Sequence, residues 1–266
     1  MLSNLFQKKP VLDDEAAEWL FQGFSWVMRN FGSDVFFQQT VLVEPSNRHF
    51  PGQENSEHTM AALILERVKG FAGVEHWPCQ LVDRHSFDET TGPVSNIHQV
   101  LKSINGDDSH SLLILYEPLQ ARNPEVMIAN YAYILAYHLA DLAQEPPPCD
   151  EEQWPYLLEL IGVYLGFGIM FVNTAQPKRS GGCGSCRSPL MERKGYLSED
   201  EVTYVLAIFC ALKNIPAKEV VPFIKSYQRS FLKKSIQDVL SRTTPLNALK
   251  SIEQATQGRS VSLTYV

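Results

Sequence analysis

Tyr133 and Tyr137 lie four residues apart in the apolar stretch AYILAYHLAD, which covers residues 132–141. On a helix this spacing places both side chains on one face, one turn above the other. Two histidines at this spacing, with a glutamate directly after the first, hold a zinc ion and take a proton from its bound water. Here the three positions carry Tyr133, Ile134 and Tyr137. The spacing therefore fits a metal site, but the residue types do not.

Tyrosine is a poor replacement for histidine as a zinc ligand, because a phenol with a pKa of about 10 stays protonated at neutral pH. Ile134 has no titratable group, so this position cannot supply a general base. His138 follows Tyr137 but is turned by about 100° around the helix, away from the shared face. We therefore expect His138 to be a partly buried, hydrogen-bonded histidine and not a metal ligand.

Several segments around this stretch carry a resemblance by their order and spacing. They are WLFQGFSWVMRNFG, VLVEPSNRHFPG, ERVKGFAGV, AYILAY, LLELIGVYLGFGIMFVNTA and KGYLSEDEVTYVLAIF, between residues 19 and 210. Together they resemble a group of uncharacterised bacterial proteins with a zincin-like, metallopeptidase-type core. The resemblance implies a His-Glu-x-x-His helix and a later acidic ligand, which map onto Tyr133, Ile134, Tyr137 and Glu159.

Three of these four positions depart from the family pattern, and Glu159 alone cannot hold a zinc ion. We expect the Glu159 carboxylate to accept a hydrogen bond from Tyr133 or Tyr137, which would satisfy it without a metal. The residues thus predict a catalytically inactive, zincin-like protein with no cofactor. Such a protein would act as a binding or scaffold module for a protein, a peptide or a small ligand.

The alternative is an enzyme that uses thiols or a metal in another place. Cys183 and Cys186 have the spacing of a zinc knuckle or a redox pair, but they lie in a loop rich in glycine, serine and basic residues. Arginines and lysines nearby, Arg193 among them, could lower the thiol pKa, yet they also fit a solvated loop. A relocated metal site would have to use His138 and Glu159.

Composition restricts the partners and the compartment. The formal net charge of −7 gives no attraction for nucleic acid or for anionic membranes. Residues 156–172 are just long enough to span a membrane, but Glu159 and the lack of a second span favour a buried core helix. The first residues lack a secretory pattern, and five scattered cysteines suit reduced thiols, so we expect a cytoplasmic protein. Cys210, in an apolar run, is expected to be a core thiol.

Hydrophobic periodicity predicts an α+β fold that is mostly helical, with a small sheet and a zincin-like helical core. We expect one domain over 1–266, with a mixed α/β front half at 1–120 and a helical half at 121–266. Ser56 and the Ser198 to Glu201 capping box predict two helix starts. The expected helices cover 13–31, 57–72, a stretch from Pro124, 154–172, a stretch from Ser198, 217–241 and 245–256. The expected strands lie within 35–44, 80–85 and 109–119.

Overall fold

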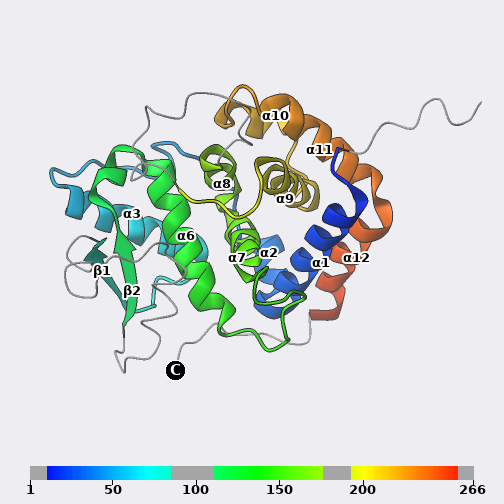
Figure 1. Ribbon diagram of the computed structural model, residues 1–266, viewed down its shortest axis with the longest axis horizontal. Helices are drawn as coiled ribbons and strands as arrows, with labels where there is room; N and C mark the ends of the chain where they lie inside the picture. The colour runs from blue at the N-terminus through cyan, green and yellow to red at the C-terminus, as the bar shows by residue number, and fades with distance from the viewer. Residues whose placement is uncertain (1–10, 85–110, 176–192, 257–266) are drawn as a thin grey trace, which may run out of the picture.

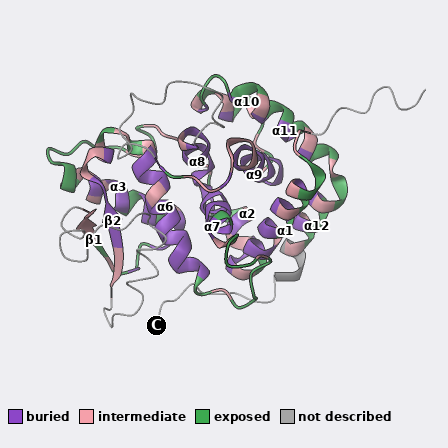
Figure 2. Ribbon diagram, in the orientation of Figure 1, coloured by how far each residue is buried: buried purple, intermediate pink, exposed green. Residues whose placement is uncertain are grey.

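The computed structural model describes residues 11–84, 111–175 and 193–256, which form a mostly helical α+β fold (Figure 1). The prediction of a mostly helical α+β fold with a small sheet is therefore confirmed. Buried apolar side chains from both halves of the chain belong to one connected core. The helices at its centre are almost wholly buried (Figure 2); they are α6, Pro124–Ala140, α7, Trp154–Gly162, α8, Gly168–Thr174, and α9, Glu199–Leu212.

The first helix begins and ends where its sequence predicts. In α1, Asp14–Phe31, the side chain of Asp13 accepts a hydrogen bond from the Ala16 amide at 2.8 Å and caps the N-terminus. In α3, Glu57–Ala72, Ser56 forms a capping box with Thr59, and Gly73 adopts the left-handed conformation that ends the helix. Helix α3 packs against α6, Pro124–Ala140, which begins at the proline that marked its start.

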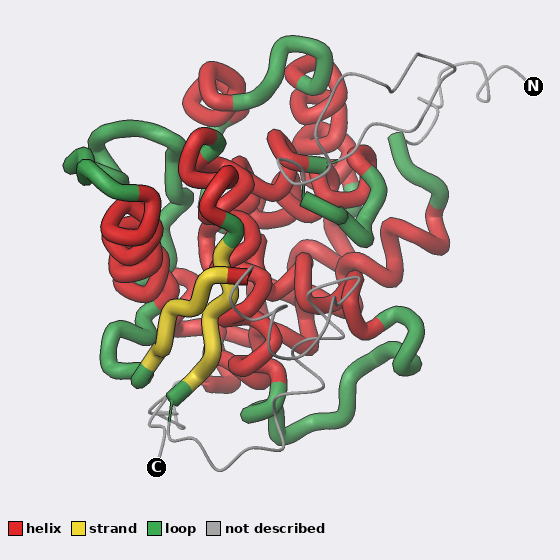
Figure 3. Tube along the Cα trace, turned by 60° about the vertical axis from the view of Figure 1, so that its left-hand side comes forward, coloured by secondary structure: helices red, strands yellow, loops and turns green. Residues whose placement is uncertain are grey.

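The sheet consists of two parallel strands at one edge of the helical body (Figure 3). Strand β1, Cys79–Asp83, pairs with β2, Leu112–Tyr116, in the register Cys79 to Leu112. Strand β2 lies within its predicted segment, 109–119, and β1 begins one residue before its predicted segment, 80–85. A short 3₁₀ helix, η1, Pro118–Arg122, then connects β2 to α6.

The prediction of a strand within 35–44 is wrong. The chain forms the short helix α2, Ser33–Gln38, and residues 40–44 make no strand pairing. The reason is tertiary packing, which overrides β propensity. The Phe36 ring packs edge-on against Phe24 and Phe209 and stacks on Tyr164, all in the core.

The apolar stretch from Trp154 is helical, as predicted, but it is not one regular helix. It consists of α7, Trp154–Gly162, a π-helical turn η2, Val163–Phe167, and α8, Gly168–Thr174. Gly166 has a φ of 102°, so the helix bends there. The whole stretch is long and apolar enough to cross a membrane by length and composition, but 94% of its most apolar window is buried inside the protein.

The C-terminal part of the chain begins with a buried helix and continues with helices that are partly exposed. Ser198 and Glu201 form the predicted capping box at the start of α9, Glu199–Leu212. The single helix expected over 217–241 is wrong, because Pro222 interrupts it. The chain instead forms α10, Ala217–Val220, the 3₁₀ turn η4, Val221–Phe223, and α11, Arg229–Ser241. Helix α12, Thr243–Thr256, packs against α1.

Candidate functional site

The five residues singled out on α6 and α7 are all buried. Tyr133, Ile134, Tyr137 and His138 lie on α6, with side chains at most 6% exposed, and Glu159 lies on α7 with no exposed area. Helices α6 and α7 pack directly against each other. The structure therefore places the predicted residues in the interior of the protein and not on the wall of an open cleft.

The carboxylate of Glu159 is held by one cation and two backbone amides. Arg193 donates from Nη1 to Oε1 of Glu159 and forms a buried ion pair with it. The amide of Tyr196 donates to Oε1 at 3.0 Å, and the amide of Leu197 donates to Oε2 at 2.9 Å. The expectation that Glu159 accepts from Tyr133 or Tyr137 is wrong in its partners. Both carboxylate oxygens instead accept hydrogen bonds from residues 193–197, later in the chain.

The sequence left open whether Arg193 lowers a thiol pKa or belongs to a solvated loop, and the structure shows that its side chain is buried. Its Nε donates to Oγ1 of Thr174 at 3.1 Å, and its guanidinium lies 4.6 Å from the centre of the Phe171 ring. Planar stacking on an aromatic face together with an ion pair is the arrangement for which arginine is best suited. Arg193 therefore connects α7 and α8 to the segment that leads into α9.

The local chain after Arg193 explains how the two amides reach Glu159. At Gly195 a side chain would come within 3.2 Å of the Arg193 guanidinium, so a residue without Cβ suits this close approach. The capping box of Ser198 and Glu201 then fixes the start of α9. Between these two points, Tyr196 and Leu197 direct their N–H groups at one carboxylate.

Aromatic packing fills the space beside Glu159. The ring of Tyr133 stacks on the ring of Tyr196, with centroids 5.8 Å apart and planes 13° apart. The ring of Tyr156 meets Tyr196 edge-on at 6.1 Å. Burial raises the pKa of Tyr133 well above its ordinary value, and the Tyr196 phenol and the Glu159 carboxylate raise it further. Tyr133 is therefore a still weaker candidate for metal binding than its residue type suggests.

The remaining positions on α6 are equally unsuited to metal chemistry. Burial raises the pKa of Tyr137, and the nearby Asp141 carboxylate adds to that effect. Ile134 is fully buried and carries no proton to transfer. Within the parts of the chain that the structure describes, no group of three or more His, Cys, Asp or Glu side chains could hold a metal ion.

His138 differs from the expected hydrogen-bonded histidine. Its Nε2 is buried and makes no hydrogen bond, and its ring meets the Tyr137 ring edge-on. Burial lowers the pKa of His138 to about 4 from an ordinary value of 6.5. The folded protein thus holds a neutral ring, while the unfolded chain can protonate it. Its contribution to stability is complete above pH about 6.5 and is lost as the pH falls toward about 4.

Substitution of His138 by leucine should therefore flatten the acid dependence of stability. Between pH about 7 and pH about 4, the wild type should lose about 3 kcal/mol more unfolding free energy than His138→Leu. Urea denaturation across this pH range measures the difference. The control is Ile134→Val, a substitution in the buried part of the same helix that removes no titratable group and should leave the shape of the wild-type pH profile unchanged. Identical profiles for His138→Leu and the wild type would contradict the buried neutral ring.

The cysteines of the described chain do not form a reactive pair. Cys79, Cys149 and Cys210 are free thiols, and burial raises the pKa of each one, to about 11 for Cys149 and about 12 for Cys210. Cys210 is fully buried, as predicted for a core thiol. Cys183 and Cys186, which carry the alternative thiol function, lie outside the described residues.

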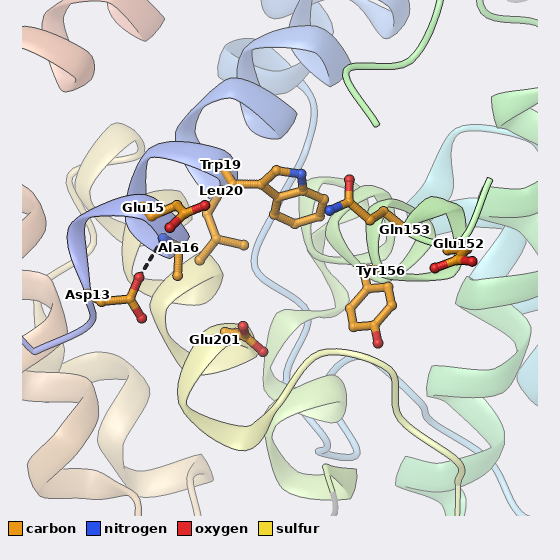
Figure 4. A pocket seen from close by; sticks show the side chains of 9 residues that line it. All are labelled: Asp13, Glu15, Ala16, Trp19, Leu20, Glu152, Gln153, Tyr156 and Glu201. Carbon is orange, nitrogen blue, oxygen red and sulfur yellow. Dashed lines mark hydrogen bonds between the residues drawn. The ribbon is translucent and has the colours of Figure 1, made fainter. Parts of the chain in front are cut away.

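A surface pocket lies near Glu159, and Tyr156 connects the two because its ring contacts Tyr196. This pocket of about 420 Å³ opens beside the N-terminal ends of α1, α7 and α9, and Figure 4 shows its side chains. The rings of Trp19 and Tyr156 line it, and Tyr156 is the same residue that meets Tyr196. The sequence did not indicate this pocket, although the acidic starts of the helices were visible. Its other polar lining residues include Asp13, Glu15, Glu152 and Glu201.

Comparisons with protein-family models, with curated proteins and with solved structures found no match to this chain.

Proposed function

We propose that this chain is a zincin-like protein without peptidase activity that serves as a binding or scaffold module in the cytoplasm. The observation that carries the proposal is the state of Glu159. Its position corresponds to the acidic zinc ligand that the family resemblance implies, but Arg193 and two backbone amides already use both of its oxygens.

Metal binding at this position would have a high cost. An incoming cation would have to displace the Arg193 guanidinium, which is itself buried and would then lack its counter-ion. Breaking a buried ion pair leaves an uncompensated charge and costs several kcal/mol. The resident arginine therefore supplies the positive charge that a metal would otherwise bring, and it supplies no hydrolytic chemistry.

Proton transfer also lacks a carrier on α6. Peptide hydrolysis by a zinc site needs a base that takes a proton from the bound water. Ile134 holds that position and is fully buried, and the flanking phenols have pKa values above the ordinary range because of burial. What supports a binding role is that the positions to which the resemblance assigns zinc chemistry are occupied by packed side chains or by an internal ion pair.

Zinc content tests this proposal directly. Protein purified without chelator should contain far less than one zinc per chain by elemental analysis, because no carboxylate or imidazole at this site is available. The matched variant is Tyr133→His/Ile134→Glu/Tyr137→His, which restores the ligand pattern. With Arg193→Gln added, it should bind zinc more tightly than with Arg193 retained, since the guanidinium no longer competes for Glu159.

The control for Arg193→Gln is the single variant Lys194→Gln, which removes an exposed charge from the neighbouring position and is titrated with zinc in the same way. That variant should behave as the wild type does. Stoichiometric zinc in the wild type that disappears in Tyr133→Phe or Tyr137→Phe would refute the proposal, and so would peptide cleavage that depends on either tyrosine.

A further inference from the structure

The pocket beside Trp19 and Tyr156 has the chemical character of a cation site. Its volume of about 420 Å³ lies within the range of about 300–1,000 Å³ that is typical of ligand pockets. Two of its lining residues are aromatic, and four carry carboxylates. None of the described residues that line it is a lysine, an arginine or a histidine. Such a lining favours a positively charged group and disfavours an anion.

The aromatic surface is accessible and not merely part of the core. Tyr156 is 37% exposed, which is unusual for a large side chain in the first turn of a helix that is otherwise buried. Figure 4 shows Trp19 on α1 and Tyr156 on α7 on adjoining sides of the pocket, with Glu201 across from Tyr156 and below Trp19. A cation over an aromatic face is attracted by the ring, and Trp and Tyr are the strongest partners.

Helix capping explains part of this acidity, but not all of it. Asp13 caps α1, and Glu201 accepts a hydrogen bond from the Ser198 amide at 2.7 Å. Each helix N-terminus carries a partial charge of about +0.5, so three of them offset about 1.5 of the four negative charges. Arg242 lies nearby, but it is paired with Asp14 and Asp238 and does not line the pocket. A net negative charge therefore remains around the aromatic rings.

We propose that this pocket binds the cationic side chain, arginine or lysine, of a peptide segment in a partner protein. This inference rests on the proposed function, because it names the ligand of the binding module. The pocket opens at the surface, and Asp13, Glu15 and Glu152 are exposed at its edge. Such a rim leaves room for the backbone of a peptide to lie outside while one side chain enters.

A peptide titration followed by NMR tests the proposal. The probe is acetyl-Gly-Arg-Gly-amide, and its neutral counterpart carries citrulline, which has nearly the same shape without the charge. The indole N–H signal of Trp19, assigned with Trp19→Phe, should shift on titration with the arginine peptide. The citrulline peptide should bind at least about tenfold more weakly, and binding of the arginine peptide should weaken as ionic strength rises from about 0.01 M to about 0.15 M.

Two variants separate the aromatic and the acidic contributions. Tyr156→Leu should weaken binding of the arginine peptide about three- to tenfold, and Glu15→Gln/Glu152→Gln about fivefold. Their controls are Tyr227→Leu and Glu54→Gln, which change exposed residues outside the pocket lining and should leave the affinity unchanged. Within the described residues the exposed Glu15 and Glu152 side chains form no hydrogen bond or ion pair, so the double variant should fold normally.

Three outcomes would overturn the assignment. The first is that the arginine and citrulline peptides bind with equal affinity. The second is that the pocket variants and their controls lose equal affinity for the arginine peptide. The third is that methylguanidinium binds as tightly as the arginine peptide. The last would show a site for small free cations. Failure here leaves the zinc measurement untouched, since zinc content is read on protein without peptide. Failure of the zinc test would refute the binding-module proposal whatever the peptide does.

Discussion

Replacement of Arg193 by methionine should lower the free energy of unfolding by about 3–5 kcal/mol at neutral pH. Methionine can keep the contact with the Phe171 ring, but it removes the positive charge that pairs with Glu159. The carboxylate then stays in the interior with only two backbone N–H donors. Urea denaturation monitored by circular dichroism gives the unfolding free energy of both proteins.

The adjacent residue provides a matched control for this prediction. Lys194 is exposed, so Lys194→Met removes the same charge from the same segment and should change stability by no more than about 0.5 kcal/mol. The double variant Arg193→Met/Glu159→Gln should be more stable than Arg193→Met, because no unpaired charge is left in the core. If Arg193→Met costs no more than Lys194→Met, the ion pair does not hold Glu159 in the folded protein.

The Arg193 result also bears on function. A carboxylate that positions α7 and the start of α9 has a structural role, so substitution of its partner should lower the free energy of unfolding. In a metal site, by contrast, loss of a ligand lowers metal affinity while the protein often stays folded. Comparing stability with zinc content in the same variants therefore separates the two roles of Glu159.

Much of the fold could be predicted from local signals. Ser56 and Ser198 marked two helix starts, because an N-cap side chain acts on amides only a few residues away. The strand error at 35–44 has the opposite origin. Val35, Phe36 and Val41 suit a strand, but Phe36 is drawn into an aromatic cluster with residues more than a hundred positions further along the chain. Periodicity contains no information about such distant partners.

The candidate site was only half predictable for the same reason. The sequence singled out Glu159 as a carboxylate in an apolar helix that must find a partner, and the structure bears this out. Its partner Arg193 lies 34 positions further on, after a polar and basic loop, and basic loops are usually solvated. Nothing in the residue types distinguished Arg193 from the exposed Lys194 beside it. Only the packing of α7 against the segment before α9 makes Arg193 buried and leaves Lys194 exposed.

The pocket illustrates a second limit. Its lining comes from the beginnings of three helices, and helix capping already explains Asp13 at the start of α1 and Glu201 at the start of α9. The net negative charge of the pocket arises only when the N-terminal ends of the three helices lie together, so no single helix reveals it. Trp19 and Tyr156, which are 137 positions apart, likewise become one aromatic lining only through the packing of α1 against α7.

The second large effect is expected at Gly166, where the helix from Trp154 to Thr174 bends. Its φ of 102° is strained for any residue with a side chain, and a Cβ at this position would overlap the carbonyl oxygen of Val41. The Gly166 carbonyl also accepts a hydrogen bond from the Val43 amide at 2.9 Å. The bend thus allows residues 41–43 to pass directly against the buried helix, in the segment for which the sequence predicted a strand.

Substitution of Gly166 by alanine should therefore destabilise the protein by at least about 4 kcal/mol, because backbone strain and steric overlap act together. Two further variants separate these causes. Gly73→Ala has a positive φ of 73° but open space around the new Cβ, so it should cost only about 1–2 kcal/mol. Gly162→Ala has ordinary helical φ but meets the Phe171 ring, and it should cost about 1–3 kcal/mol. Urea denaturation of the three variants gives this ranking directly. If Gly166→Ala proved as mild as Gly73→Ala, the close passage of Val41 across the bend would be wrong.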